Sequence, residues 1–310
     1  MPKSKKSIYS ALAANILIAI TKFIAGTVSN SSAMIAEGVH SVVDTINELL
    51  LLYGIRLSKK PADARRPFGY GKELYFWSFI VAILIFGLGG GISIYQGYLH
   101  IRNPEPLGDP TWSYVVLIMS ILFEGTSLVI AFKEFNQLRG EEGMWSAIHR
   151  SKDPTSFTIL FEDGAAVMGL LVVLAAVYLG HRYHLPYLDG IATVTVGVIL
   201  VGVSLILARE SRSLLMGEGI APETQKKMTT LIEKDPHVKK VIHILSTYQS
   251  PEEIVLMLVI DFHEDLDTTE INEAIERIRE NIREAYPLVR YVLIQPEFYE
   301  EAPRDKAINS

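Results

Sequence analysis

The chain has 310 residues, a formal net charge of −6, 49% apolar residues and no cysteine. The absence of cysteine excludes disulfide bonds and thiolate metal sites. From residue 209 onward the chain carries 13 basic and 20 acidic residues, whereas the preceding part carries 16 and 15. We therefore expect an apolar membrane part followed by an acidic soluble part, which lacks the charge pattern of a nucleic-acid-binding protein.

The first apolar run, at about residues 7–28, follows Lys3, Lys5 and Lys6 and has no small-residue cleavage pattern. We interpret it as a retained helix and not as a signal peptide. Five more runs reach the length of about 20 residues that a membrane-spanning helix needs. The six predicted spans cover about 7–28, 32–57, 73–100, 111–133, 155–180 and 187–208.

Basic residues gather in alternate loops. Five follow the second span and four follow the fourth, whereas the loops at the other ends of the spans hold only Arg102 and Arg182. By the positive-inside rule, both termini are expected in the cytoplasm, and an even number of spans agrees. The basic loop residues are Lys59, Lys60, Arg65, Arg66 and Lys72, then Lys133, Arg139, Arg150 and Lys152.

The second span carries ionisable side chains where lipid makes them costly. His40 and Asp44 lie in the segment AMIAEGVHSVVDTINELLLLYG. A spacing of four places both side chains on one helix face. An ionisable group inside a membrane is a functional candidate by default, and an imidazole with a carboxylate is half of a site for a divalent cation such as Zn²⁺.

The fifth span offers two more acidic residues at a similar depth. If the second helix begins near Ser31, Asp44 lies about 20 Å below the outer edge of an apolar core about 30 Å thick. If the antiparallel fifth helix begins near Thr155, Asp163 lies about 18 Å below that edge. Glu162 is adjacent but about 100° around the helix, so either residue or both could complete the site. The predicted metal ligands are His40, Asp44, Asp163 and Glu162, for Zn²⁺ with Mn²⁺, Fe²⁺ and Co²⁺ not excluded.

The alternative is a purely structural role, in which these groups pair with one another or with Lys22. Five ionisable groups, however, outnumber what one lysine can neutralise. An uncompensated buried carboxylate either takes up a proton or binds a cation, and both outcomes serve an exchange of metal for protons. His40 is a candidate proton carrier because an unperturbed imidazole titrates near neutral pH. The five groups are Glu37, His40, Asp44, Glu162 and Asp163.

Other polar residues of the spans are interpreted as contacts between helices. Glu124, Asn15 and Asn47 belong to this group, since interhelical hydrogen bonds are common inside membrane bundles. Small residues allow close helix packing, which we expect for the third span. Its glycines are Gly87, Gly89, Gly90 and Gly91.

The character of the sequence changes after Gly217. APETQKKMTTLIEKD has amphipathic helical periodicity, VKKVIHILSTYQ and EEIVLMLVIDF are typical of strands, TTEINEAIERIRENIREAY predicts a helix and VRYVLIQPEF a strand. The predicted fold is an α-helical membrane protein, with a six-transmembrane-helix bundle and a small C-terminal α+β (α-β-β-α-β) cytoplasmic domain. The predicted division is 1–213 for the bundle, 214–298 for the cytoplasmic domain and 299–310 for a disordered tail.

Several segments together carry a family resemblance: ALAANILIAITKFIAG, HSVVD, RRPFGYGKE and YLDGIATVTVGVIL, with the C-terminal α+β segment. Over nearly its whole length the sequence resembles the cation diffusion facilitator family of divalent-metal/proton antiporters. The resemblance implies a homodimer in which each protomer transports and the cytoplasmic domains help to dimerise.

The sequence departs from the common family pattern in three places. The fifth span, TILFEDGAAVMGLL, has no acidic residue or histidine four positions after Asp163, and resembles a branch with a Glu-Asp pair that includes a mitochondrial zinc transporter. After the second span, Asp63 matches a metal-binding aspartate of some members, but Arg66 and Tyr70 replace the histidines, so no metal is expected there. The last strand lacks a metal-binding histidine. The cytoplasmic histidines, interpreted as ordinary surface or strand residues, are His237, His243 and His263.

The resulting hypothesis is a multi-pass protein of the cell inner (plasma) membrane that exports Zn²⁺, or a similar ion, from the cytoplasm in exchange for protons. Its expected partners are the metal ion, protons, lipid and a second copy of the chain, with no cofactor. The alternative is a non-transporting metal sensor or scaffold that retains the fold. Enzyme function is not expected, because no nucleophile lies beside a base.

Overall fold

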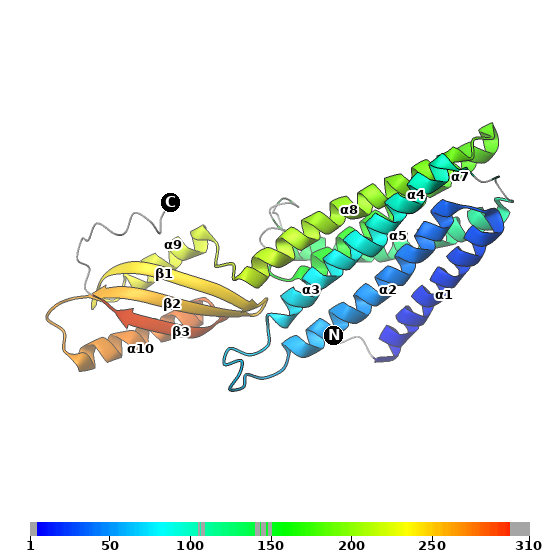
Figure 1. Ribbon diagram of the computed structural model, residues 1–310. Coiled ribbons are helices and arrows are strands. Elements are labelled where there is room, and N and C mark those ends of the chain that lie inside the picture. The colour runs from blue at the N-terminus through cyan, green and yellow to red at the C-terminus, as the bar shows by residue number, and fades with distance from the viewer. Residues whose placement is uncertain are drawn as a thin grey trace. The chain divides into compact units, whose positions relative to one another are not determined.

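The computed structural model describes residues 5–104, 106, 109–139, 143, 147 and 151–297, with side chains from Asn15 onward except Leu138, Arg139 and Ser156. The chain divides into two compact units (Figure 1). The first unit contains the residues up to Lys60 together with Glu73–Ser213. The second contains Pro61–Lys72 together with the residues from Leu214 onward. The predicted tail, 299–310, lies outside the described residues.

The first unit is a bundle of long helices, as the sequence predicts. The third predicted span is continuous but changes from α-helix to π-helix and back. The helices are α1 (Lys5–Ser29), α2 (Ser32–Ser58), α3 (Glu73–Leu84), η1 (Ile85–Gly91), α4 (Ile92–Arg102), α5 (Thr111–Arg139), α7 (Pro154–Tyr183) and α8 (Tyr187–Met216).

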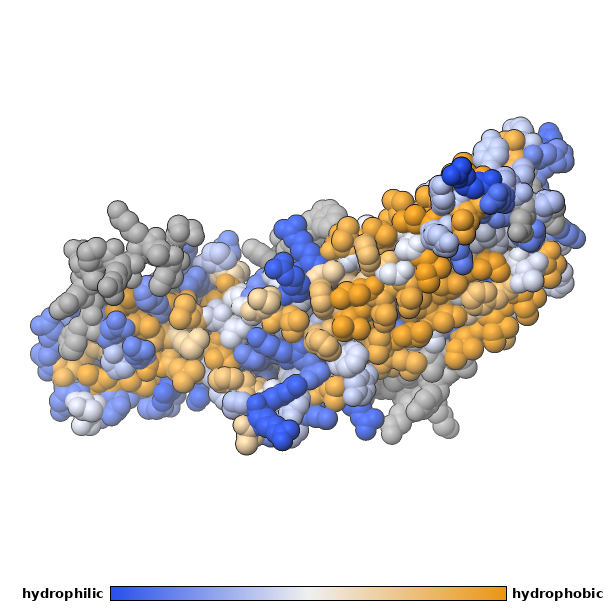
Figure 2. All heavy atoms as spheres, viewed as in Figure 1, coloured by the Kyte–Doolittle hydropathy of each residue, from blue (hydrophilic) through white to orange (hydrophobic). Residues whose placement is uncertain are grey.

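Length and composition of the described residues agree with a membrane location. Four helical segments are long and apolar enough to cross a bilayer: Glu73–Arg102, Thr111–Gln137, Phe157–Tyr183 and Tyr187–Met216. Figure 2 shows apolar residues over most of the visible side of this unit. The exposed large side chains include Leu17 on α1, Leu122 on α5 and Leu205 on α8, which suits contact with lipid. Helix α2 is more polar, because it carries the ionisable residues of the predicted site.

Glycines bring the third span and α8 into close contact. A Cβ atom on Gly97 would lie 2.7 Å from the carbonyl oxygen of Gly190, and one on Gly190 would lie 2.9 Å from that of Gly97. About two helical turns nearer the middle of the bundle, Gly90 and Gly197 face each other in the same way. A Cβ atom on Gly90 would lie 3.0 Å from the carbonyl oxygen of Gly197, and one on Gly197 would lie 2.9 Å from that of Gly90. The predicted close packing is therefore confirmed at Gly90, whereas a Cβ atom on Gly87 would meet no described residue of another segment within 4 Å.

The second unit is a three-stranded sheet with two helices. Strand β1 pairs antiparallel with β2, and β2 pairs parallel with β3, so that the strand order is β1-β2-β3. The predicted order of helix, strand, strand, helix, strand is confirmed. The elements are α9 (Pro222–Ile232), β1 (Val238–Ser250), β2 (Glu253–Phe262), α10 (Thr268–Ala285) and β3 (Val289–Pro296).

The core of the second unit lies between its sheet and its helices. Alternate residues of β2, such as Leu256 and Leu258, are buried with Ile278 and Ile282 of α10. Period two on the strand and period 3.6 on the helix place both apolar sets in one layer. Helix α10 starts at a capping box, in which the side chains of Asp267 and Glu270 each accept a hydrogen bond from the other's backbone N–H at 2.8 Å.

The loop Pro61–Lys72 belongs to the second unit although it connects α2 to α3. The Phe68 ring meets the ring of Tyr291 in β3 edge-to-face, with centroids 5.5 Å apart. Gly71 packs so closely on β1 that a Cβ atom there would clash with the carbonyl oxygen of Gln249. The end of α2 is thus continuous with a segment that is packed on the cytoplasmic sheet.

Candidate metal site in the helix bundle

Helix α2 positions four polar residues of the site. Ser31 caps the start of the helix, and its side chain accepts a hydrogen bond from the backbone N–H of Met34 at 3.2 Å. Glu37, His40, Asp44 and Asn47 follow at spacings of three, four and three, which keeps them on one face. That face is turned into the bundle: the side chain of His40 is 2% exposed and that of Asp44 is 18% exposed. The predicted helix and face are both found.

His40 and Asp44 lie next to each other without a completed hydrogen bond. The Nδ1 atom of His40 is 3.3 Å from Oδ1 of Asp44. Both ring nitrogens of His40 and Oδ1 of Asp44 are buried and have no hydrogen-bond partner among the described residues. Burying a polar atom without a partner costs about 1–3 kcal/mol. These atoms are therefore chemically available to a ligand such as a metal ion.

From α7, it is Glu162 that faces Asp44. The two carboxyl groups lie within hydrogen-bonding reach of each other. A hydrogen bond between two carboxyl groups requires a proton on one of them. Asn47 of α2 donates through Nδ2 to Oε1 of Glu162 at 2.6 Å, which fixes the orientation of that side chain. The structure thus brings together His40, Asp44 and Glu162.

Asp163 points to a different neighbour. Its Oδ2 atom accepts a hydrogen bond from the hydroxyl of Ser127 in α5 at 2.7 Å. Because successive residues of an α-helix are about 100° apart, Glu162 and Asp163 face different helices. The depth of a residue in the membrane, on which the prediction rested, gives its level but not the direction in which its side chain points. Asp163 as a ligand stays a prediction, as does the rest of the ligand set.

The described residues do not form a closed coordination shell. Within them, no group of three or more His, Asp or Glu side chains is arranged to hold a metal ion. The arrangement in the bundle is a pair of neighbouring groups, His40 and Asp44, with Glu162 beside it.

Lys22 of α1 pairs with Glu37. The two side chains are fully buried, with Nζ 3.2 Å from Oε2 of Glu37 and 2.8 Å from the hydroxyl oxygen of Ser41. Lys22 is therefore engaged one turn away from His40. Among the described residues, the acidic groups of the candidate site have no such basic partner: Asp44 contacts a histidine and another carboxyl group, and Asp163 a hydroxyl.

The asparagines of the bundle make interhelical hydrogen bonds, as predicted. Asn15 of α1 donates to Oε2 of Glu48 in α2 at 3.1 Å, and Asn47 donates to Glu162. Sequence reasoning did not connect Asn47 with the site. Its position three residues after Asp44, on the same helix face, is the signal that could have done so.

In the loop after α2, Asp63 is held by protein groups. Its carboxylate accepts hydrogen bonds from the backbone N–H groups of Arg65 and Arg66 at 2.9 and 2.8 Å, and from the Tyr70 hydroxyl at 2.7 Å. The Tyr70 hydrogen bond is the largest of the causes that lower the pKa of Asp63 below its usual value. Arg66 and Tyr70, which replace the histidines, thus hold the carboxylate of Asp63. The absence of a metal here stays a prediction.

The cytoplasmic histidines lie in ordinary structural positions. His237 precedes β1 and contacts the guanidinium of Arg277 at 2.9 Å, His243 lies within β1, and His263 follows β2. Among the described residues of this unit, too, there is no three-ligand cluster. The expectation that no regulatory metal binds here stays a prediction.

Two family models match almost the whole chain. One, described as the cation efflux transmembrane domain, matches residues 8–216. The other, described as the cation efflux protein cytoplasmic domain, matches residues 220–299. The junction between them falls between the end of α8 and the start of α9.

Relatives of known name agree with these matches. The human mitochondrial protein named proton-coupled zinc antiporter SLC30A9 is 31% identical over 83% of this chain and 46% of its own length. Metal tolerance protein C4 of Arabidopsis thaliana is 33% identical over 84% of this chain and 57% of its own. The chain thus spans about half the length of these two relatives.

A relative of similar length is the manganese efflux system protein MneP of Bacillus subtilis, which is 26% identical over 96% of this chain and 97% of its own. A solved structure of the MamM CTD aligns at 18% identity over 26% of this chain and 98% of its own, with a TM-score of 0.24. With both halves of the chain matched, the protein belongs to the cation efflux family, whose members are transporters and not enzymes.

Proposed function

We propose that the protein exports a divalent metal cation, Zn²⁺ in the first place, from the cytoplasm in exchange for protons. The observation that carries this proposal is the convergence of His40, Asp44 and Glu162 inside the bundle, with imidazole nitrogens that have no hydrogen-bond partner in the described residues. A site of imidazole and carboxylates suits Zn²⁺, and intramembrane ionisable residues mark ion pathways. We rank Glu162 above Asp163 as the ligand from α7.

Exchange with protons follows from competition for the same atoms. A metal ligand must be deprotonated, so a cation that enters between Asp44 and Glu162 displaces a proton that the two carboxyl groups share. Protons that arrive from the other side reverse this step and release the metal. Rocking of α2 and α7 against the rest of the bundle would open the site to one side at a time.

The choice of metal is the least constrained part of the proposal. Nitrogen and carboxylate ligands also suit Mn²⁺, Fe²⁺ and Co²⁺, and selectivity depends on geometry and metal availability. One relative is named a zinc antiporter and another a manganese efflux protein, so both ions need testing. The alternative of a non-transporting metal sensor or scaffold predicts binding without flux.

We further propose that the protein is a homodimer that dimerises through its cytoplasmic unit, with both termini in the cytoplasm. The match to the family's cytoplasmic domain and the basic loops after the second and fourth spans support this. We keep the cell inner (plasma) membrane as the proposed location, although one relative is named as a mitochondrial protein.

The test is metal flux into proteoliposomes across an imposed pH gradient, with Zn²⁺ and Mn²⁺ in competition. We expect wild-type flux to depend on the gradient, and His40→Ala and Asp44→Ala to abolish it. Zinc flux that is unaffected by both substitutions would overturn the proposal. Stoichiometric metal binding with no flux in the wild type would instead favour the sensor.

A further inference from the structure

A cavity lined by polar and apolar residues lies at the end of the bundle where α1 ends and α2 begins. Its volume is about 520 Å³. Residues of α1, α2 and α4 line it, and the polar ones include Asn30, Ser31, Ser32, Gln96, His100 and Asn103. Asp44 lies about 18 Å further along α2, at about 1.5 Å per residue from Ser32, so this cavity is separate from the site described above. In the proposed orientation it is the end away from the cytoplasm.

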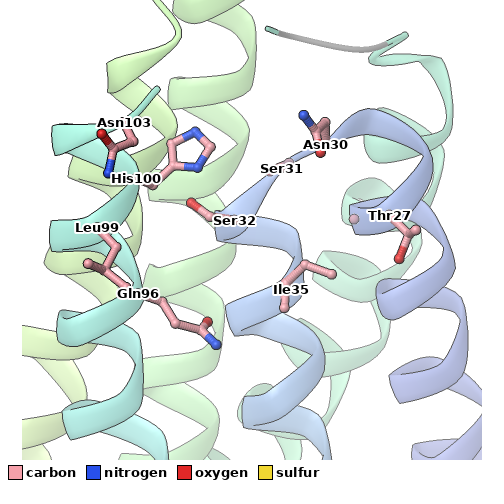
Figure 3. A pocket seen from close by; sticks show the side chains of 10 residues that line it. Thr27, Asn30, Ser31, Ser32, Ile35, Gln96, Leu99, His100 and Asn103 are labelled. Atoms are coloured by element: carbon pink, nitrogen blue, oxygen red, sulfur yellow. The ribbon is translucent and has the colours of Figure 1, made fainter. Parts of the chain in front are cut away.

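His100, in the last turn of α4, has a ring nitrogen without a hydrogen-bond partner among the described residues. The residue is 9% exposed, and its Nε2 atom is buried with no hydrogen-bond partner among the described residues. Figure 3 shows its ring projecting from α4 toward the first turn of α2, where Ser31 and Ser32 lie. A buried nitrogen without a hydrogen-bond partner costs about 1–3 kcal/mol, so this atom is expected to take one.

Behind this ring lies a rigidly held carboxylate. Asp189, in the first turn of α8, is 3% exposed, and its Oδ2 atom is 3.8 Å from Nε2 of His100. The carboxylate accepts hydrogen bonds from the hydroxyls of Ser31 and Ser32 at 2.5 and 2.7 Å and from the backbone N–H of Ala33 at 3.0 Å. Three donors from the start of α2 thus fix its position.

This pairing has the form of a carboxylate that orients a metal-binding histidine. Histidines that bind metal donate their second ring N–H to a carboxylate or carbonyl, which sets the tautomer. Here Nε2 faces Asp189, and a movement of about 1 Å would complete the hydrogen bond. The other ring nitrogen, Nδ1, then offers its lone pair to the cavity. The amide oxygens of Asn30, Gln96 and Asn103 are the neutral oxygen donors nearby.

We propose that this cavity is a second, weaker binding site for a divalent cation, with His100 as its nitrogen ligand, amide oxygens and water as its other ligands, and Asp189 as the positioning residue. One imidazole with neutral oxygens binds less tightly than a site that includes two carboxylates. A weak site at the exit end holds a departing ion briefly without trapping it, as multi-site ion pathways require. Only the identity of the cation rests on the proposed function; binding itself does not.

The test is equilibrium metal binding to the purified full-length protein in detergent, with Co²⁺ followed by its visible absorption and Zn²⁺ by competition. The starting protein carries His40→Ala and Asp44→Ala, which removes the first site. We expect one weak site per protomer to remain. Adding His100→Ala should lower its affinity by about tenfold or more and remove the nitrogen-dependent part of the Co²⁺ spectrum, and Asp189→Asn should lower the affinity by about tenfold.

His181→Ala is the matched control, since His181 lies in the last turn of α7 at the same end of the bundle and does not line the cavity. It should leave the weak site unchanged. Size-exclusion elution identical to that of the starting protein will show that His100→Ala is folded; if it is not, His100→Gln replaces it. The inference is overturned if no site remains in the starting protein, or if the remaining site survives His100→Ala. Neither result depends on flux, so the failure of this inference is distinct from the failure of the proposed function.

Discussion

Two neighbouring acids on α7 have different surroundings, although they share a depth in the bundle. Glu162 contacts Asp44 and Asn47 of α2, while Asp163 contacts Ser127 of α5. We therefore expect a metal ion held by His40 and Asp44 to bind Glu162 more readily than Asp163, whose carboxylate faces α5. This difference assigns them different roles, and it can be tested with variants that preserve volume.

We expect Glu162→Gln to reduce Zn²⁺ affinity by about tenfold or more, because it removes a charged ligand and leaves the Asn47 contact possible. Asp163→Asn is the matched variant, since it also replaces one carboxylate by an amide and keeps an acceptor for the Ser127 hydroxyl. It should change the affinity much less. The measurement is Zn²⁺ titration of the purified protein. Equal losses in the two variants, or a larger loss in Asp163→Asn, would contradict the assignment.

The sequence identified the residue types of the candidate site and its level in the membrane, but not its geometry. The period of the helix was enough to place His40 and Asp44 on one face, because that relation is local. Which of Glu162 and Asp163 faces α2 depends on the rotation of α7 about its axis. That rotation results from the packing of α7 against α2 and α5 together, which no local pattern encodes. The same limit applies to Asn47, whose partner lies on another helix.

At the scale of elements, the third span and α8 pack through facing glycines. Gly97→Ala should lower the stability of the bundle by about 1–3 kcal/mol, since the added methyl group would lie 2.7 Å from backbone and side-chain atoms of α8 and the helices would have to separate. Gly125→Ala in α5 is the control, because no described residue of another helix lies within 4 Å of the added carbon. It should be neutral or slightly stabilising. The midpoint of thermal unfolding in detergent measures both, and equal shifts would argue against close packing as the cause.

In the cytoplasmic unit, α10 is joined by an ion pair to the residues that follow α9. Arg277 donates to both carboxylate oxygens of Asp235, at 3.0 and 3.2 Å. Burial alone would raise the pKa of Asp235, but the hydrogen bonds from Arg277 and from the backbone N–H of His237 outweigh it and hold the pKa below 3.8. A lowered pKa means that the folded state favours the charged carboxylate. This pair therefore stabilises the unit above pH 3.8, and the stabilisation is lost as the pH falls from there through the folded-state pKa.

Arg277→Met should consequently destabilise this unit near neutral pH and have little effect at strongly acidic pH. Because the arginine side chain is 41% exposed, solvent screens the pair and we expect a loss of only about 1 kcal/mol. Urea unfolding of the full-length protein, followed by hydrogen exchange in peptides of β1 and β2, measures it. Arg279→Met removes an exposed pair with Glu276 and should have a smaller effect. An Arg277→Met effect that does not change with pH would refute this explanation.

The elements themselves follow well from the sequence, since apolar run length and period are local properties. The six predicted runs coincide with helices, four of which are long and apolar enough to cross a bilayer, and the helix-strand order after Gly217 agrees with the observed elements. Two features could not be predicted from run length and period. The π-helical segment Ile85–Gly91 interrupts the third span within its glycine run, and the loop Pro61–Lys72 is packed with the cytoplasmic sheet. The loop packs on residues far away in the chain, and it has no periodicity from which its partner could be inferred.

For the whole molecule, that loop has a consequence for transport. It connects α2, which carries His40 and Asp44, to α3, and its residues Phe68 and Gly71 are packed on the cytoplasmic sheet. If α2 moves during transport, its cytoplasmic end moves against a segment that this packing holds. Such connections act as hinges, which alter the rate of a conformational step without touching the bound ligand.

We therefore expect Phe68→Ala to change the maximal rate of metal flux several-fold while leaving metal affinity at the bundle site unchanged. The reason is that Phe68 loses its ring contact with Tyr291, whereas His40, Asp44 and Glu162 keep their surroundings. Phe86→Ala is a suitable control, because Phe86 lies in η1 with 47% of its surface exposed on the bundle and should alter neither quantity. Flux into proteoliposomes and Zn²⁺ titration of the same preparations separate the two effects. A change in affinity, or an equal change in rate for the control, would show that the loop does not act through its packing on the sheet.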